Sequence, residues 1–258
     1  YLSKNKEYNY VARWAGGNNA GHTVYINDIK YKTHLIPCGI FHGIKSIIGP
    51  GCVLNLNSFL EEVRYLNASG FDIDLIKVSS KTHIVTDEHI QKDKDKYHKK
   101  LGTTAKGIAP CYSDKMARTG IRAESIPELQ GFIWDNNLSG NILCEGAQGF
   151  YLDIDYGNYP YVTSSTTLPY AACSLGFSPK KIRNIWGVSK IYDTRSGVDP
   201  MFPRSLFEDK DLLKLGDLGS EFGVTTGRRR QVNWLNLDYL LNAAEISGSN
   251  IIVINKCD

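Results

Sequence analysis

β-Branched and aromatic runs alternate along the chain with stretches of helical spacing. Runs typical of strands lie at residues 8–14, 23–29, 32–36, 142–144, 182–188 and 251–254. Helical spacing is found at residues 57–70, which Asn57 or Ser58 is expected to cap, and at residues 235–246. Such alternation is typical of α/β folds. We predict one domain over residues 1–258, built around a mainly parallel or mixed central sheet with flanking helices.

The charge and the cysteine content give no reason to expect a nucleic acid, a membrane surface or a zinc ion as ligand. A net charge of +3 over 258 residues gives no general reason to expect a nucleic acid or a membrane surface as partner. The six cysteines are scattered without C-x-x-C spacing, so no zinc site is expected. Widely spaced cysteines are typical of reduced thiols in a cytoplasmic protein. No apolar run is long enough to span a bilayer.

Two loops combine glycine with groups that suit an anion. Residues 16–23 (GGNNAGHT) follow the first predicted strand, and their glycines would let the backbone approach phosphate oxygens. His22 could act there as an acid or electrophile near neutral pH. Residues 102–107 (GTTAKG) offer two hydroxyls, and Arg118 adds a cation with fork geometry. Taken alone, each loop has a simpler interpretation. Residues 16–23 could be a turn in which His22 is hydrogen-bonded within the protein, and residues 102–107 a surface turn near an exposed Arg118.

Further polar side chains follow the strand at residues 142–144, where ligand sites of open α/β sheets lie. Residues 145–149 (EGAQG) include Gln148, whose amide offers both a donor and an acceptor to a base edge or carbonyl. Residues 159–165 (YPYVTSS) include Thr163 and Ser164, whose hydroxyls suit phosphate or could cap a helix.

The last part of the chain carries an arginine run and a short base-recognition motif. Residues 225–230 (TTGRRR) place three arginines in succession, which do not share one helix face. They indicate a site that binds several negative charges at once, such as those of a dicarboxylate and of phosphates. A solvated basic patch or an RNA contact is the alternative. Residues 255–258 (NKCD) end a β-branched run, a context in which N-K-x-D is typical of guanine recognition.

The ordered set of motifs resembles the adenylosuccinate synthetase family. The matching segments are residues 16–23, 34–40, 102–115, 145–149, 159–165, 225–230 and 255–258. They stand in the order that the family shows, and this order is more specific than any single motif. The resemblance implies an α/β fold with a P-loop-GTPase-like guanine site. It also implies a ligase of purine biosynthesis that joins L-aspartate to IMP, with GTP as co-substrate, giving adenylosuccinate, GDP and phosphate.

The resemblance implies a set of contacts to IMP. His22 resembles the catalytic general acid that polarises the purine O6 atom. Arg118 resembles the arginine that reaches the IMP phosphate of the other subunit, which implies a homodimer. The remaining IMP contacts implied by the family are Asn19, Thr104, Gln148 and Thr163.

Further implied roles concern aspartate, GTP and Mg²⁺. The aspartate-binding residues are Thr226, Arg228 and Arg230. The GTP-binding residues are Gly21, His22, Thr23, Arg230, Lys256 and Asp258. The carbonyl of Gly21 resembles a Mg²⁺ ligand, and His34 resembles a histidine near the phosphates.

The mechanism that the family implies has two steps. A carboxylate removes the N1 proton of IMP while O6 attacks the γ-phosphate of GTP, and the 6-phosphoryl-IMP intermediate then loses phosphate to the aspartate amine. Positioned cations and a donor to O6, such as His22, suit this chemistry. The family's loop G-D-E-G-K-G-K, with its catalytic aspartate and phosphate-binding lysine, does not occur in the sequence, and we expect it before Tyr1. The family's last guanine-binding segment is expected after Asp258.

Two other functions fit part of the pattern. Residues 196–200 (SGVDP) differ from the family's V-G-x-G-P beside the ribose, which suggests a relative that uses dGMP and ATP to make a 2-amino analogue of adenylosuccinate. The NKCD motif and the arginine run favour GTP and IMP instead. A GTP-binding regulatory module without ligase activity is the third hypothesis, but it would have no obvious use for Gln148 or residues 225–230.

Overall fold

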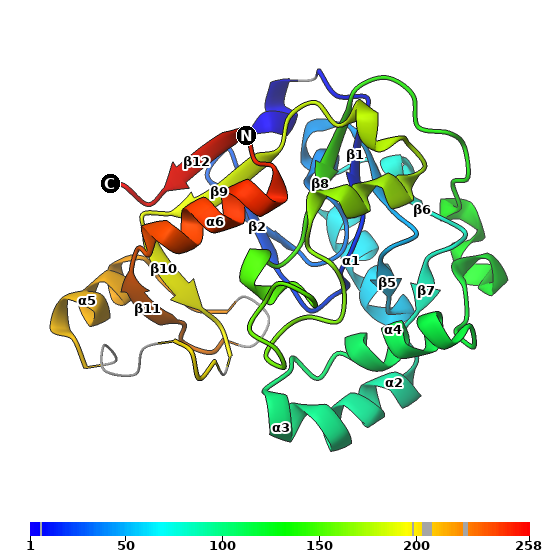
Figure 1. Cartoon of the computed structure of the whole chain (residues 1–258). Helices are drawn as coiled ribbons and strands as arrows, with labels where there is room; N and C mark the ends of the chain where they lie inside the picture. The colour runs from blue at the N-terminus through cyan, green and yellow to red at the C-terminus, as the bar shows by residue number, and fades with distance from the viewer. Residues whose placement is uncertain (6, 198, 203–207, 224–226) are drawn as a thin grey trace.

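A parallel sheet of four strands, in the order β6-β4-β1-β8, forms the centre of the structure (Figure 1). The computed structural model describes residues 1–5, 7–197, 199–202, 208–223 and 227–258. Because β1 and β8 are parallel neighbours, with Arg13 opposite Glu145, both strands end at the same edge of the sheet. The predicted α/β class, with a parallel central sheet and flanking helices, is confirmed.

The elements within the described residues have the following bounds. The strands are β1 (Tyr10–Arg13), β2 (His22–Ile26), β3 (Ile29–Thr33), β4 (Lys45–Ile48), β5 (Val53–Leu54), β6 (Ile76–Val78), β7 (His83–Ile84), β8 (Ile142–Glu145), β9 (Trp186–Lys190), β10 (Tyr192–Arg195), β11 (Gln231–Trp234) and β12 (Ile251–Asn255). The α-helices are α1 (Leu56–Ala68), α2 (Asp87–Lys92), α3 (Lys99–Leu101), α4 (Ile108–Ala117), α5 (Lys210–Leu218) and α6 (Leu237–Ser247). A π-helical stretch, η4 (Asp93–His98), joins α2 to α3.

The helix α1 begins at Leu56, and its N-cap lies two residues before the nearer of the two expected caps. Its N-cap is Asn55, which has extended backbone angles and whose side chain accepts a hydrogen bond from the amide of Ser58. The prediction that Asn57 or Ser58 caps this helix is wrong, because both residues already lie inside its first turn.

The core of the molecule lies between α1 and the central sheet. Phe59 and Leu66 of α1 are buried together with Ile48 of β4 and Ile76 of β6. Each such side chain stabilises the fold by roughly 1.5–3 kcal/mol relative to exposure. This packing holds the strand ends, and therefore the loops that follow them, in fixed positions.

The β2–β3 hairpin differs in register from the sequence prediction. The turn falls at Asn27 and Asp28, whose φ angles are 48° and 64°. Asparagine and aspartate tolerate this left-handed conformation, which two-residue hairpin turns require. The turn therefore comes earlier than expected, and His22 becomes the first residue of β2, opposite Thr33.

A second group of elements stands beside the central sheet (Figure 1). The strands β9 and β12 form a parallel pair, and β10 and β11 form an antiparallel pair against which α5 packs. The strand predicted at residues 251–254 is confirmed as β12, and its side chains are only partly buried, with Ile252 40% exposed. The reason is that β12 belongs to a two-stranded sheet, which leaves more of its surface open than a central strand does.

Candidate functional site

A cavity of about 860 Å³ lies among loops that follow β1, β8 and β9. Its size is ordinary for a small-molecule site. The expected site residues that line it are Asn19, Gly21, Thr104, Gln148, Thr163 and Arg230. Other expected residues that the structure describes lie outside this lining: His22, Thr23, Arg118, Arg228, Lys256 and Asp258. Thr226 falls outside the described residues.

His22, at the start of β2, is held by a carboxylate at the end of β8. The Nδ1 atom of His22 lies 2.9 Å from Oε1 of Glu145. The other oxygen of Glu145 accepts a hydrogen bond of 2.9 Å from the amide of Cys38. A carboxylate at Nδ1 favours a proton on that nitrogen and orients the ring, so Nε2 is the nitrogen left for a ligand.

The pKa of Glu145 is strongly lowered. Burial raises the pKa, but the hydrogen bond and charge of His22, together with the charge of Arg13, outweigh that effect and bring the pKa to about 2. Glu145 is therefore ionised at neutral pH and provides a fixed negative charge behind His22.

This lowered pKa predicts a stability change in acid. The ionised carboxylate stabilises the fold above the usual glutamate pKa, and this contribution, roughly 3 kcal/mol at most, is lost as pH falls from about 4.5 toward about 2. Urea unfolding should show the native protein more stable than Glu145→Gln at about pH 6, with a clearly smaller difference at about pH 3. An equal difference at both pH values would contradict the assignment.

Gln148 presents an acceptor that has no partner among the residues that the structure describes. Its Nε2 atom donates to Oδ1 of Asn19 over 3.3 Å, while its Oε1 atom is buried without a hydrogen bond. Its φ of 61° is rarely adopted by residues other than glycine. An unsatisfied buried acceptor is unfavourable unless a ligand donates to it. The geometry therefore suits a ligand N–H or O–H group beside Asn19.

The loop at residues 102–107 is fastened by a buried carboxylate and leads into a helix. Asp93 accepts hydrogen bonds from the Thr103 hydroxyl at 2.6 Å and from the amide of Gly107 at 2.8 Å. These contacts hold Thr104 in the cavity wall. The helix α4, which the sequence analysis did not predict, begins at Ile108 directly after this loop. A helix N-terminus at this position favours bound anions.

The three successive arginines have different surroundings. Arg230 lines the cavity and contacts Glu221 at 2.7 Å. Arg228 donates to the carbonyl of Gly102 over 3.4 Å, which links this segment to the threonine loop. Arg229 instead pairs with the exposed Asp217 at 2.8 Å and does not line the cavity. The three arginines were expected to bind anions together, but Arg229 does not take part at the cavity. Neighbouring side chains of an extended segment point to opposite faces.

The N-K-x-D motif reaches the cavity through its first residue. Asn255 ends β12, pairs in register with Lys190 of β9, and lines the cavity. Lys256 has a φ of 59°, and its Nζ atom donates to the carbonyl of Gly219 over 2.9 Å. Lys256 and Asp258 are exposed, so their expected role toward guanine stays a prediction.

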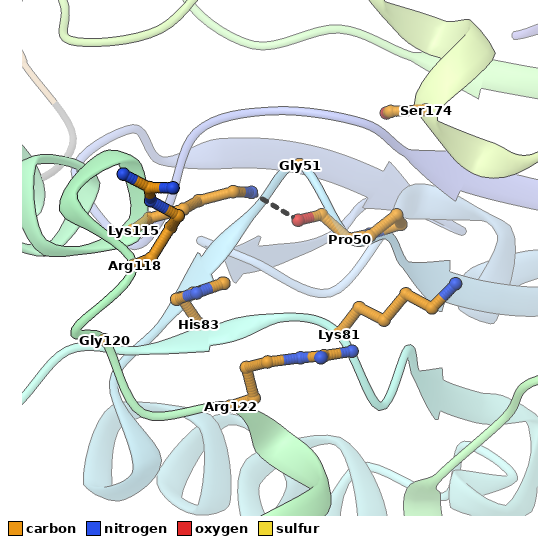
Figure 2. Close-up of a pocket in the computed structure, with 9 residues that line it drawn as sticks. All are labelled: Pro50, Gly51, Lys81, His83, Lys115, Arg118, Gly120, Arg122 and Ser174. Atoms are coloured by element: carbon orange, nitrogen blue, oxygen red, sulfur yellow. Dashed lines mark hydrogen bonds between the residues drawn. The ribbon is translucent and has the colours of Figure 1, made fainter.

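Arg118 lies in a separate basic cavity of about 640 Å³, shown in Figure 2. The other charged or titratable residues that line this cavity are Lys81, His83, Lys115 and Arg122. The Nζ atom of Lys115 donates to the carbonyl of Pro50 over 2.6 Å. Burial, and then the positive charge of Lys115, lower the pKa of His83. The two cavities share no lining residue, and Arg118 lines only the basic one.

Glycine-, threonine- and arginine-bearing segments that line one cavity beside a parallel sheet are typical of a nucleotide-using α/β enzyme. The family model of adenylosuccinate synthetase matches residues 1–136 and 128–258. The adenylosuccinate synthetase of Clostridium botulinum (strain Langeland) is 37% identical over 318 residues, covering 100% of this chain and 73% of that protein. That of Thermodesulfovibrio yellowstonii is 38% identical over 306 residues, covering 96% and 71%. The chain belongs to the adenylosuccinate synthetase family.

Solved structures give the same result. The fully ligated adenylosuccinate synthetase of Plasmodium falciparum superposes with a TM-score of 0.88 at 32% identity, covering 99% of this chain and 72% of that one. The succinoaminodeoxyadenylate synthetase of cyanophage S-2L, bound to dGMP and dATP, gives a TM-score of 0.80 at 20% identity, with 98% and 78% covered. The second likeness shows the fold alone.

The predicted function is confirmed by these relationships. The chain is a ligase that forms a C–N bond, joining L-aspartate to IMP in a GTP-dependent reaction of AMP biosynthesis. The dGMP-using relative is only a distant neighbour. A regulatory GTP module without ligase activity does not fit family membership over the whole chain.

Several residues of the site had no role assigned from the sequence. Glu145 stands in the EGAQG segment, and its place at the end of β8 was the only clue to a role beside His22. Lys190 and Tyr192 line the cavity from β9 and β10. Glu221 binds both of them, although no motif of the sequence analysis included it.

The described residues include no membrane-spanning helix and no cluster of metal-binding side chains. No helix among them is both long and apolar enough to cross a membrane. No group of three or more histidine, cysteine or acidic side chains in the described segments could hold a metal ion. All six cysteines are free thiols.

Proposed function

We propose that the large cavity binds IMP together with GTP and L-aspartate, and that the residues expected from the family act there. The observation that supports the proposal is that residues from separate segments line the same cavity. Asn19, Thr104, Gln148 and Thr163 come from four separate segments, yet they line one cavity with Arg230. Hydroxyl and amide groups of this kind suit a nucleoside monophosphate, and the α4 N-terminus beside Thr104 suits its phosphate.

His22 acts on O6 of the purine in this proposal. Glu145 holds Nδ1 at 2.9 Å, and the doubly protonated ring also carries an N–H at Nε2, which donates a hydrogen bond to O6 as negative charge develops there. After N1 of IMP loses its proton to the family's catalytic carboxylate, O6 attacks the γ-phosphate of GTP, which gives 6-phosphoryl-IMP and releases GDP. The aspartate amine then attacks C6, displaces inorganic phosphate and loses a proton. The unpartnered Oε1 atom of Gln148 accepts from a donor on the ligand and so fixes the purine in the cavity.

The arginine segment serves aspartate and GTP in the same proposal. Arg228, Arg230 and Thr226 bind the two carboxylates of aspartate, and paired arginines suit a dicarboxylate. GTP is held by Gly21, His22, Thr23 and Arg230, while Lys256 and Asp258 bind guanine. Support for the guanine assignment is that Asn255, from the same motif, lines the cavity.

Mg²⁺ fits this site as an ion bound mainly through the nucleotide. Gly21 lines the cavity, and its backbone carbonyl is the expected protein ligand. No cluster of three or more metal-binding side chains lies in the described segments. That agrees with an ion that takes most of its ligands from phosphate oxygens and water. When bound, Mg²⁺ neutralises developing phosphate charge.

A homodimer is part of the proposal, in a cytoplasmic setting that suits six free thiols. Arg118 lies in a basic cavity apart from the substrate cavity of its own chain. In a two-fold symmetric dimer it would bind the IMP phosphate of the partner, and each partner would do the same in return.

Mixing two inactive variants tests this arrangement. Arg118→Leu and His22→Asn should each have little activity as homodimers. An equimolar mixture, allowed to exchange subunits, should regain about a quarter of native activity, because half of the dimers are mixed and each has one intact site. Arg64→Leu, on the exposed side of α1, is the control for Arg118→Leu. A mixture no more active than its components would contradict the shared site.

Calorimetric titration of the full-length protein with IMP tests the cavity assignment. We expect IMP to bind with a dissociation constant in roughly the micromolar range, and more tightly when GTP and Mg²⁺ are present. Gln148→Ala and Thr163→Ala should weaken binding, whereas Thr119→Ala, outside both cavity linings, should not. Unchanged IMP affinity in both cavity variants would contradict the assignment.

A further inference from the structure

One buried carboxylate lies behind the cations of the substrate cavity. Glu221 is 2% exposed and accepts hydrogen bonds from three side chains that line the cavity. Its Oε2 atom lies 2.8 Å from Nζ of Lys190 and 2.7 Å from Nη1 of Arg230. Its Oε1 atom accepts from the hydroxyl of Tyr192 at 2.7 Å. Both carboxylate oxygens are therefore occupied by donors from different strands.

The backbone fixes Glu221 relative to Arg230. The amide of Arg230 donates to the Glu221 carbonyl over 2.9 Å, and a bridge joins Phe222 to Arg229. The Glu221 amide in turn donates to the carbonyl of Gly216 over 2.9 Å. These backbone contacts hold Glu221 and Phe222 next to Arg229 and Arg230. The carboxylate of Glu221 and the guanidinium of Arg230 therefore meet in a fixed geometry.

The contacts also determine the charge of this group. Burial raises the pKa of Glu221, but the hydrogen bonds from Lys190, Tyr192 and Arg230 outweigh that effect and lower it. The carboxylate is thus ionised, and the two cations that share its Oε2 atom exceed it by one positive charge. Without the anion between them, Lys190 and Arg230 would repel each other and move apart.

We infer that Glu221 is a positioning residue of the ligase, which holds Arg230 and Lys190 as a fixed pair of donors toward the anionic groups of aspartate and the nucleotide. Further contacts complete the arrangement: Arg230 donates to the Ser196 hydroxyl over 3.2 Å and Lys190 donates to that of Thr194 over 2.9 Å. Ser196 and Thr194 also line the cavity. The inference rests on the proposed role of Arg230, and it adds Lys190 as a second cation of the same site.

A purely structural role for Glu221 makes a different prediction. Tyr192 belongs to a small core with Leu212 and Val232, so loss of its partner could simply loosen that core. Loosening would lower the melting temperature and impair all substrates together. A positioning role would raise the KM values for aspartate and GTP and leave that for IMP unchanged, because the expected IMP contacts lie on other segments.

Steady-state kinetics of the full-length enzyme, with the three substrates varied in turn, separate these cases. Glu221→Gln keeps the shape of the side chain but removes the charge, and should raise the KM for aspartate up to about 100-fold. Tyr192→Phe keeps the carboxylate and both cations, and should give a smaller change of the same kind. Asp217→Asn is the matched control, because Asp217 pairs with the neighbouring Arg229 away from the cavity. Melting temperatures show whether each variant folds.

The outcomes are distinct. A selective rise for aspartate and GTP in Glu221→Gln, with native values in Asp217→Asn, supports the inference. Should Glu221→Gln not fold, the same selective change in Tyr192→Phe supports it and native kinetics there overturn it. Unchanged KM values in a folded Glu221→Gln, or an equal rise for all three substrates, also overturn it. Arg230→Ala separates the two proposals: if that variant is impaired and Glu221→Gln is not, only the role of Glu221 fails.

Discussion

Replacement of His22 by asparagine should lower kcat by roughly 10²–10⁴-fold, the range typical for loss of a positioned proton donor. Asparagine can still donate to Glu145 from its amide, in the place of Nδ1, but it has no counterpart of Nε2. The variant should therefore keep its fold while losing the donor to the purine O6. Initial rates under saturating IMP, GTP and aspartate, with circular dichroism of the same samples, measure both effects.

A control histidine makes this result specific. His42, in the 3₁₀ turn at Cys38–His42, belongs to none of the sequence segments that match the family motifs. His42→Asn should therefore keep native activity. If His22→Asn were fully active with its fold intact, His22 would not be the catalytic group, and a different donor to O6 would have to be sought.

Removal of the guanidinium of Arg230 should have the second large effect. Arg230→Ala deletes a cavity-lining cation and leaves Glu221 with Lys190 and Tyr192 as donors. Loss of one partner from a buried, hydrogen-bonded charge pair commonly costs about 2–5 kcal/mol, so kcat/KM for aspartate should fall at least about 30-fold. The KM for GTP should also rise, because Arg230 is expected to contact both ligands. Rates measured at varied aspartate and varied GTP give the two values.

Arg64→Ala provides the comparison for this variant. Arg64 is exposed on α1, and its Nε atom donates to the carbonyl of Leu60 within the same helix. Its removal should leave all three KM values unchanged. Native kinetics in Arg230→Ala would contradict the proposed role of Arg230 in binding aspartate and GTP.

Much of the architecture could be predicted from local patterns in the sequence. The strands β1 and β12 have dense β-branched or aromatic content, β8 is a short apolar run, and α1 has one apolar face, although its cap was misplaced. The large cavity could also be anticipated, because polar loops that follow parallel strands gather at one sheet edge. Gln148 and Thr163 stand in such loops, the role of Asn19 was implied by the family resemblance, and all three line one cavity.

Other features depend on tertiary contacts that no local pattern reveals. The pairing of His22 with Glu145 joins residues that are far apart in the sequence and meet only because β8 lies next to β1. The helix α4 has a proline inside its first turn and small residues, so its apolar periodicity is weak. Its position becomes clear only from the contacts of Asp93 with the preceding loop. Buried Glu221 is equally invisible, because its partners come from two other strands and from Arg230.

The walls of the substrate cavity belong to sheets that share no strand pairing within the described residues. Gln148 follows β8 of the four-stranded sheet, whereas Lys190 and Asn255 end the separate β9–β12 pair. A ligand that contacts both walls therefore connects the two sheets, which no strand-to-strand hydrogen bonds join. The first substrate to bind meets the entropic cost of aligning the two walls, and the next one finds them already aligned. Each substrate would then increase the affinity of the enzyme for the next one, because the cavity lies between two separate sheets. This coupling would be reciprocal between the ligands, and largest for two ligands that contact different walls.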